Sequence, residues 1–319
     1  VLGSEHTRAY QQVAMQSRLK IPLLFGQDVI HGYKTNFPIP LAEAASWDLP
    51  AIERSARIAG TEAAAAGIHW TFAPMVDVAR DPRWGRVMEG AGEDPWLGGQ
   101  IAAARVKGFQ GRQLGDLDAV MATAKHFAAY GAAIGGRDYN AVDISERTLH
   151  EVYLPPFKAA LDAGALTVMS AFNDINGVPA SASHQLMTVI LREEWKFRGF
   201  VVSDYTADFE LVAHGYASDD REATELAFNA GLDMSMQSGL YGAHLAALVE
   251  DGKVDMQTVD DSVRRVLAIK GAIGLFDNPY RSLDPQRESE LDPSQHAALA
   301  REAAQRSMVL LKNDGDVLP

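Results

Sequence analysis

A carboxylate stands directly after an apolar run in the segment VVSDY at residues 201–205. The run is typical of a buried strand, so Asp204 is predicted to lie where that strand ends. An ionised carboxylate there can attack an electrophilic carbon and form a covalent intermediate. Aspartate after a strand is also common as a helix N-cap or turn residue, and spacing alone favours that structural role. The neighbours of Asp204 therefore decide its assignment.

Two further strand-like runs also end in reactive side chains. Lys125 and His126 are adjacent, and they could hold sugar hydroxyls or, for the lysine, form a Schiff base. Successive strand residues point to opposite faces, so both reach one site only if the strand bends into its loop there. Asp28 follows Gln27 at the end of another run, and an equally simple role for it is to cap a helical turn.

The loop DPRWGRVMEGAGEDP at 81–95 combines charges of both signs with glycines and a tryptophan. The guanidinium of Arg86 can make forked hydrogen bonds to vicinal hydroxyls, and Glu89 or Glu93 can hold it in place. The alternative is a self-contained ion-pair loop that ends in a helix N-cap. Asp94 before Pro95 is predicted to be that cap in either case.

Short apolar runs alternate with longer amphipathic, alanine-rich stretches, and this alternation is typical of βα units. In a parallel α/β barrel the carboxyl ends of the strands share one face, so the polar strand ends would converge there. We predict a TIM-like (β/α)8 barrel, incomplete at the N-terminus, although an open doubly wound sheet gives a similar alternation. The predicted strands lie near 22–28, 70–74, 119–127, 166–172, 200–204 and 232–236, and the predicted helices near 6–17, 49–66, 95–110, 145–163, 183–195 and 221–230.

The composition limits the partners of the chain. It carries 29 basic and 42 acidic residues, a net charge of -13, which disfavours nucleic acid and anionic membranes. The absence of cysteine excludes disulfides and thiolate chemistry but leaves the compartment open. A metal hydrolase using His31, His69 and His126 is a weak alternative, because no HxH or HExxH spacing occurs. We therefore expect no metal and no cofactor.

The chain divides into three predicted parts. Residues 1–275 carry the βα pattern, and 276–295 are rich in Asp, Pro, Asn and Ser, as linkers often are. Residues 296–319 are predicted to form a helix and a first strand, near 308–313, that leads toward a further domain. No apolar signal core or membrane-spanning run occurs.

Taken together, these motifs make the sequence similar to glycoside hydrolase family 3, and to its bacterial periplasmic β-glucosidases in particular. The resemblance covers the whole chain and includes GGRDYN at 135–140. It implies a retaining, exo-acting β-glucosidase, periplasmic or secreted, with a barrel domain that supplies an aspartate nucleophile. A separate αβα sandwich domain would supply the glutamate acid/base. The six motifs that carry it, in order, are GQDVIHG, DPRWGRVMEGAGEDP, KHFAAYG, MSAFNDINGVPA, GFVVSDY and LLKNDGDVLP.

By motif match, the resemblance implies that Asp204 is the nucleophile. It assigns Asp28, Arg86, Lys125 and His126 to the hydroxyls of the sugar in the first subsite, with Lys125 and His126 on a non-standard bend. The substrate implied is a β-glucoside or gluco-oligosaccharide of the cellobiose type. A homodimer is left open.

Four positions, compared with the family pattern, bear on the site and on the expected substrate. Phe172 stands where many members have Tyr, so a hydroxyl that could bond the nucleophile is absent. Tyr205 replaces a common Trp and changes the stacking surface for the leaving group. The KHFAAYG loop disfavours N-acetylglucosaminides, and Asp28, shorter than the Glu of xylosidases, favours a hexose. A β-xylosidase, a non-catalytic carbohydrate-binding barrel and, less so, a Lys125 Schiff-base aldolase remain the alternatives.

Overall fold

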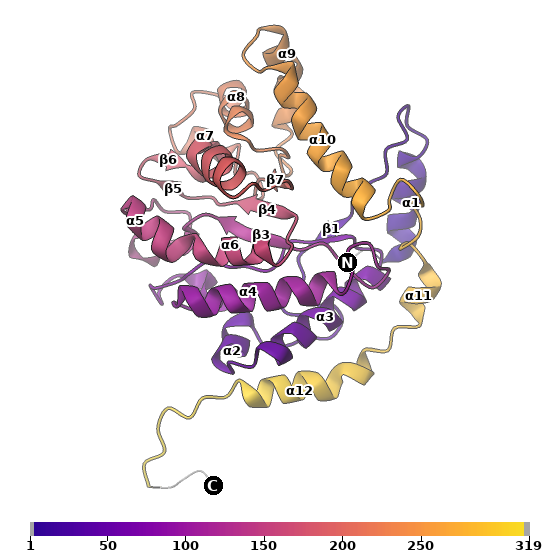
Figure 1. The fold of residues 1–319 in the computed structure, drawn as a ribbon, viewed down its shortest axis with the longest axis vertical. Helices are drawn as coiled ribbons and strands as arrows, with labels where there is room; N and C mark the ends of the chain where they lie inside the picture. Colours follow the sequence, from indigo (N-terminus) through magenta and orange to yellow (C-terminus); the bar gives the residue numbers. More distant parts are fainter. Residues whose placement is uncertain (1–2, 316–319) are drawn as a thin grey trace.

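The computed structural model describes residues 3–315, and its central feature is a curved series of parallel strands covered by helices (Figure 1). β1 pairs with β2, and β4 pairs with both β3 and β7, all in parallel. Single bridges join Trp70 to Met121 and Val202 to Met234, so the series follows the order of the chain. The strands are β1 (Gly26–Gln27), β2 (Trp70–Thr71), β3 (Thr123–Phe127), β4 (Thr167–Ser170) and β7 (Phe200–Val202), with an antiparallel hairpin of β5 (Asp174–Ile175) and β6 (Val178–Pro179).

The class is thus mixed α/β, as predicted, and the strands are shorter than the apolar runs suggested. Within residues 3–315, no strand pairing joins β1 to the segment 232–236. That segment contributes the single bridge at Met234 rather than a full strand. The extended run 308–313 has no strand partner in the described part, and residues 316–319 of the same predicted segment lie outside it.

The helices that cover the strands agree with the sequence pattern where strong caps define their ends. Asp48 accepts a hydrogen bond from the N–H of Ala51 at the start of α3, and Asp94 accepts one from Leu97 at the start of α4. The main helices are α1 (Ser4–Ala14), α3 (Leu49–Ala65), α4 (Pro95–Gln110), α6 (Pro155–Asp162), α8 (Asp220–Ala230), α9 (Leu240–Glu250), α10 (Met256–Ala272) and α12 (Ala297–Arg306), with short helices α2 (Pro40–Ala45), α5 (Glu146–Thr148), α7 (Glu210–Ala213) and α11 (Pro285–Ser289).

Two predicted helices have a different form, and α9 and α10 were not predicted. The stretch 145–163 is interrupted by a wider turn at Leu149–Tyr153 before Pro155 and Pro156, which lack the N–H that would continue the ladder. The stretch 183–195 forms a π-helix over Gln185–Glu194 instead of an α-helix. α9 and α10 each carry an apolar stripe, and α10 places Ile269 on the inner strand cluster.

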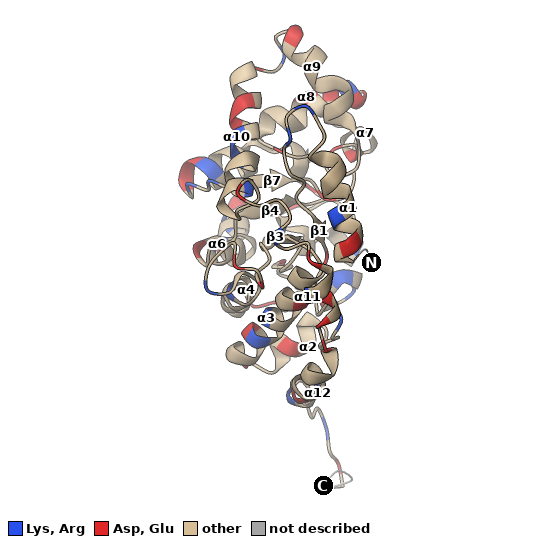
Figure 2. Ribbon diagram, turned by 90° about the vertical axis from the view of Figure 1, so that its right-hand side faces the viewer, with Lys and Arg blue, Asp and Glu red and all other residues tan. Residues whose placement is uncertain are grey.

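The strands separate two apolar clusters. On the inner face Trp70, Phe200 and Val202 pack together, and the indole N–H of Trp70 donates to the hydroxyls of Thr123 and Thr167 at 2.6 and 2.9 Å. On the outer face the helices bury a larger cluster against the same strands. Charged residues lie mainly on the outer helices and loops, so the strands form a rigid core whose ends can position polar groups (Figure 2).

The last described segment wraps around the outside of the molecule. After α10 the chain runs through α11 and α12, and α12 lies beside α2 and α3 before the chain leaves the body (Figures 1 and 2). Polar contacts attach this segment to the helices beneath it. Arg306 pairs with Asp48, and Nδ1 of His296 lies 2.8 Å from the fully buried Glu62. The segment 284–306 is thus a fixed part of the described structure.

Candidate active site

Asp204 lies two residues beyond the last residue of β7, at the carboxyl edge of the sheet. It caps no helix, because α7 begins only at Glu210, but its carbonyl accepts the N–H of Ala207 at 3.1 Å, so Asp204 does open a turn. Its side chain is 14% exposed, and Oδ1 accepts a 2.6 Å hydrogen bond from the N–H of Tyr205. Asp204 is therefore accessible to a ligand at one edge and fixed by the backbone at the other.

His126 links Asp204 to a second, buried carboxylate. Its Nε2 lies 3.1 Å from Oδ2 of Asp204, within ion-pair distance but not aligned as a hydrogen bond. Its Nδ1 lies 2.8 Å from Oδ2 of Asp77, and the same oxygen accepts the backbone N–H of His126 at 2.9 Å. Asp77 thus fixes both the ring and the backbone of His126, as carboxylates behind functional histidines do.

Lys125 reaches the same site from the neighbouring position. The pairing of β3 with β4 shifts register between Lys125 and Phe127, which interrupts the regular alternation of side chains. The Lys125–His126 peptide bond is cis. Nζ of the buried Lys125 lies 2.6 Å from Oδ1 of Asp28, whose side chain is largely exposed. The predicted bend is present, and it brings Lys125, His126 and Asp28 to the same edge.

In the loop 81–95, Arg86 makes one ion pair within the loop and one contact with an aromatic ring outside it. Its Nε and Nη2 donate to the two oxygens of Glu89 at 2.7 and 3.0 Å, and together they form a forked pair. The guanidinium carbon lies 5.6 Å from the centre of the Tyr130 ring. Glu89, rather than Glu93, is thus the carboxylate that orients Arg86.

Aromatic side chains surround these charges. Phe172 is buried beside His126, with ring centroids 6.3 Å apart, and it also contacts Tyr139 at 4.7 Å. Tyr205 is 57% exposed at the rim, in a position to offer a ring face to a ligand. Tyr130 is fully buried and packs edge-on against His126 at 5.3 Å. The site thus combines an apolar wall with an exposed aromatic rim.

The surrounding charges set the ionisation of Asp204. Burial disfavours its charged form, but His126, the N–H of Tyr205 and Lys125 outweigh burial and hold the pKa of Asp204 below its usual value. Glu210 behaves oppositely, because burial and the charge of Asp204 raise the pKa of its carboxyl.

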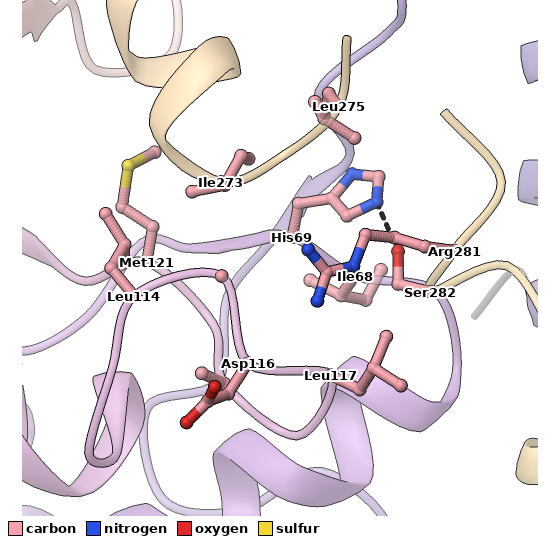
Figure 3. A pocket seen from close by; sticks show the side chains of 12 residues that line it. Ile68, His69, Leu114, Asp116, Leu117, Met121, Ile273, Leu275, Arg281 and Ser282 are labelled. Atoms are coloured by element: carbon pink, nitrogen blue, oxygen red, sulfur yellow. Dashed lines mark hydrogen bonds between the residues drawn. The ribbon is translucent and has the colours of Figure 1, made fainter. Parts of the chain in front are cut away.

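The histidines do not form a metal site. His69 precedes β2 at the amino edge of the sheet, and His126 ends β3 at the carboxyl edge. Figure 3 shows His69 in a narrow pocket, where its Nε2 lies 2.6 Å from Oγ of Ser282. Burial lowers the pKa of His69 to about 4, so its neutral ring is built into the structure. Among residues 3–315, no three His, Asp or Glu side chains are placed to hold a metal ion.

Four residues of the site had no predicted role. Asp77 was not among the predicted site residues, although it is the group that fixes His126. Tyr130 and Tyr139 lie in motifs that the sequence shows, but only the fold reveals their ring contacts. Glu210 carries a weak signal, since it follows Asp204 by six residues in a short helical turn.

The fold and this edge define an α/β protein whose parallel strands carry an aspartate, a lysine, a histidine, an arginine and aromatic rings at their carboxyl ends. Residues 2–269 match the Glycosyl hydrolase family 3 N terminal domain. The chain belongs to this family. No helix within residues 3–315 is long and apolar enough to cross a membrane.

Several relatives match nearly the whole chain. A periplasmic β-glucosidase of Salmonella typhimurium is 47% identical over 97% of this chain and 41% of its own length. A putative β-xylosidase of Formosa agariphila is 36% identical over 95% of this chain and 41% of its own length. The crystal structure of a Listeria innocua β-glucosidase in complex with glucose superposes with a TM-score of 0.95 and 43% identity, over 100% of this chain and 44% of that one. The chain thus spans less than half the length of these relatives.

Proposed function

We propose that this chain is the nucleophile-bearing part of a retaining, exo-acting β-glucosidase, with Asp204 as nucleophile. One observation carries the proposal. Asp204 lies at the catalytic edge with its pKa lowered by His126 and Lys125, despite burial that would otherwise raise it. An attacking carboxylate needs to be ionised at neutral pH, and His126, the N–H of Tyr205 and Lys125 favour that form of Asp204.

In the proposed reaction a carboxylate oxygen of Asp204 bonds to the anomeric carbon as the bond to the leaving oxygen breaks. The leaving oxygen takes a proton from an acid, and water then hydrolyses the glycosyl ester with the same group acting as base. Neither step oxidises or reduces the sugar, and the acid/base supplies the proton transfers, so the proposed reaction needs no cofactor or metal. The acid/base is a glutamate outside this chain, on an αβα sandwich domain. The greater length of the relatives supports this part of the proposal.

Asp28, Lys125, His126 and Arg86 are the proposed contacts to the hydroxyls of the nonreducing-end sugar. Their donors and acceptors already face one edge of the sheet, and each cation is held by a carboxylate. Such preorganisation allows hydrogen bonds to strengthen as the ring flattens in the transition state. Phe172 would form the apolar wall, and Tyr205 would stack on the leaving group.

The proposed organisation has a barrel over residues 1–275, a linker over 276–295 and a lead into the sandwich domain over 296–319. The strand series in chain order, with its inner cluster of Trp70, Met169 and Phe200, is consistent with most of a (β/α)8 barrel. A periplasmic or secreted location is proposed from the name of the Salmonella relative. Pairing into a homodimer is a further possibility that sedimentation of the purified chain would decide.

A β-xylosidase is the second candidate, because relatives with that name share 36% identity with this chain. Asp28 favours glucose over xylose, since a short carboxylate leaves room for a hydroxymethyl group. Comparing labelling by 2-fluoro glucosyl and 2-fluoro xylosyl fluorides would separate the two. Faster labelling by the xylosyl donor would replace the glucosidase proposal.

The decisive experiment is incubation of the folded chain with 2-deoxy-2-fluoro-β-glucosyl fluoride, followed by intact mass and peptide mapping. The fluoride leaves without a proton, so the missing acid is not required. We expect a stable glycosyl adduct on the Asp204 peptide, absent from Asp204→Ala. A folded chain that gives no adduct would overturn the proposal that this chain holds a competent nucleophile. Glucose binding without an adduct would favour a non-catalytic carbohydrate-binding barrel instead.

A further inference from the structure

The carboxylate of Asp204 has acceptor capacity that the described contacts do not fill. Oδ1 accepts one hydrogen bond, from the N–H of Tyr205, and Oδ2 faces His126. Each oxygen of an ionised carboxylate can accept about two hydrogen bonds. A further donor at the open edge of Asp204 would therefore fix the direction of its attack, and Phe172, whose ring packs beside His126, carries no hydroxyl.

Tyr139 packs against the aromatic side chains of this site and is held firmly there. Its backbone has a φ of +63°, a left-handed conformation that non-glycine residues adopt only when the surroundings stabilise it. Its ring packs edge-on against Phe172 at 4.7 Å and against Tyr130 at 6.2 Å. Both partners are buried, whereas Tyr139 itself is 50% exposed. The ring is thus anchored against two buried aromatic side chains, and half of Tyr139 remains exposed.

The loop that carries Tyr139 is tied to the rest of the site. Oδ1 of its neighbour Asp138 accepts a 2.8 Å hydrogen bond from the indole N–H of the buried Trp84. Asn140 on the other side donates to the carbonyl of Ile134 at 3.0 Å. These bonds fix the backbone on both sides of Tyr139, so its side chain occupies a defined place.

Ring contacts connect Tyr139 to Asp204 through one histidine. Phe172 packs against the rings of both Tyr139 and His126, and Nε2 of His126 lies 3.1 Å from Oδ2 of Asp204. Burial raises the pKa of the phenol, and the negative charges of Asp138, Glu210 and Asp204 raise it further, whereas Arg86 acts in the opposite direction. The phenol therefore lies within electrostatic reach of both Asp204 and Arg86, which lie on different loops. It remains protonated at neutral pH and can act as a hydrogen-bond donor.

We propose that Tyr139 is a further positioning residue of this site, whose hydroxyl donates to the carboxylate of Asp204 when a glucoside is bound. The inference rests on the proposed function and deepens it, because it assigns the donor that Phe172 lacks to a neighbouring loop. The hydroxyl would orient the attacking oxygen and help to keep it ionised. The ring, in turn, would be held by its contacts with Phe172 and Tyr130.

The first test is the rate of glycosyl-adduct formation from the 2-fluoro glucosyl fluoride in Tyr139→Phe, measured against pH. This variant keeps the ring packing and removes only the hydroxyl. We expect a roughly tenfold slower reaction and an acid limb shifted to higher pH, because Asp204 loses a donor to its charged form. Tyr10→Phe on α1 is the matched control and should match the wild type. A rate and an acid limb unchanged in Tyr139→Phe would overturn the proposal.

The second test does not depend on catalysis. The phenol of Tyr139 is titrated by NMR in protein labelled with 13C at tyrosine Cζ, with its signal assigned by Tyr139→Phe. In Asp204→Asn the midpoint should move to lower pH, because a neighbouring negative charge is gone. An unmoved midpoint would contradict the proximity on which the inference depends. If the wild type forms no adduct but the midpoint moves, the proposed function fails while the placement of Tyr139 stands.

Discussion

Replacing Asp77 with asparagine tests whether the buried carboxylate behind His126 controls the reactivity of Asp204. One oxygen of Asp77 accepts both the ring Nδ1–H and the backbone N–H of His126, at 2.8 and 2.9 Å. An asparagine oxygen can accept the same two bonds, so the variant removes charge while it preserves shape. The expected effect is therefore electrostatic rather than a collapse of the site.

The size of the effect follows from these two bonds. A hydrogen bond to a charged partner contributes about 1 kcal/mol more than a neutral one, so the two together amount to roughly 2 kcal/mol. At about 1.4 kcal/mol per tenfold, this predicts that adduct formation slows about 30-fold. The weaker hold on His126 should also raise the pKa of Asp204, so the acid limb of the rate should shift to higher pH.

The assay is the time course of adduct mass with 2-deoxy-2-fluoro-β-glucosyl fluoride between pH 3 and 8. Asp251→Asn is a matched control, because Asp251 is exposed and pairs with Arg221 outside the site. Near-ultraviolet circular dichroism checks that both variants are folded. An Asp77→Asn protein with the rate and pH profile of the wild type would refute the role given to this carboxylate.

Three other substitutions test parts of the structure separately. Glu89→Gln should weaken protection of Asp204 by glucose about tenfold, because the forked pair that orients Arg86 loses its charge, whereas Asp81→Asn in the exposed pair with Arg83 should change it little. Asp233→Asn should lower the free energy of unfolding in urea by about 3 kcal/mol, since the buried Asp233 pairs with both Arg192 and Arg265. Glu62→Gln should destabilise the chain at neutral pH, because bonds from Thr35, Lys34 and His296 outweigh burial and lower the pKa of Glu62. That stabilisation is complete above the ordinary glutamate pKa and is lost as pH falls through the lowered one, so melting curves of the two proteins should converge in acid.

The sequence predicted well those features that local chemistry determines. Asp48 and Asp94 mark the starts of α3 and α4 because each caps its helix, and the signal needs no knowledge of the fold. Strand ends were less predictable, because apolar runs continue beyond the residues that pair. The broken alternation at Lys125 and His126 depends on backbone geometry that residue types alone do not specify.

The same distinction applies to the site. Asp204, Asp28, Arg86, Lys125 and His126 were predicted as site residues because their motifs carry them. Asp77 was passed over because its partner, His126, is 49 residues away in sequence. Tyr139 and Glu210 were passed over because a tyrosine in a glycine-rich loop and a glutamate at a helix start are common on any surface. These residues contact other site residues only because the fold brings separate loops together.

The charge pattern of the site bears on where the catalytic proton comes from. Lys125, His126 and Arg86 each lie against a carboxylate, in the pairs Asp28–Lys125, Asp77–His126 and Glu89–Arg86. Burial would raise the pKa of Glu89, but Arg86 outweighs burial and lowers it, so Glu89 is a poor source of a proton at neutral pH. Asp204 and Glu89 are thus both held in their charged forms.

Glu210 is the exception, because its pKa is raised by burial and by Asp204. If the acid lies on another domain, the chain alone should release only good leaving groups, and Glu210→Gln should leave the steep dependence on leaving-group pKa unchanged. Single-turnover rates for a series of aryl glucosides would measure this, with Glu225→Gln on the outer helix α8 as the control. A selective loss of the poor leaving groups in Glu210→Gln would instead make Glu210 the proton donor, and the chain would then contain both carboxylates of a retaining site.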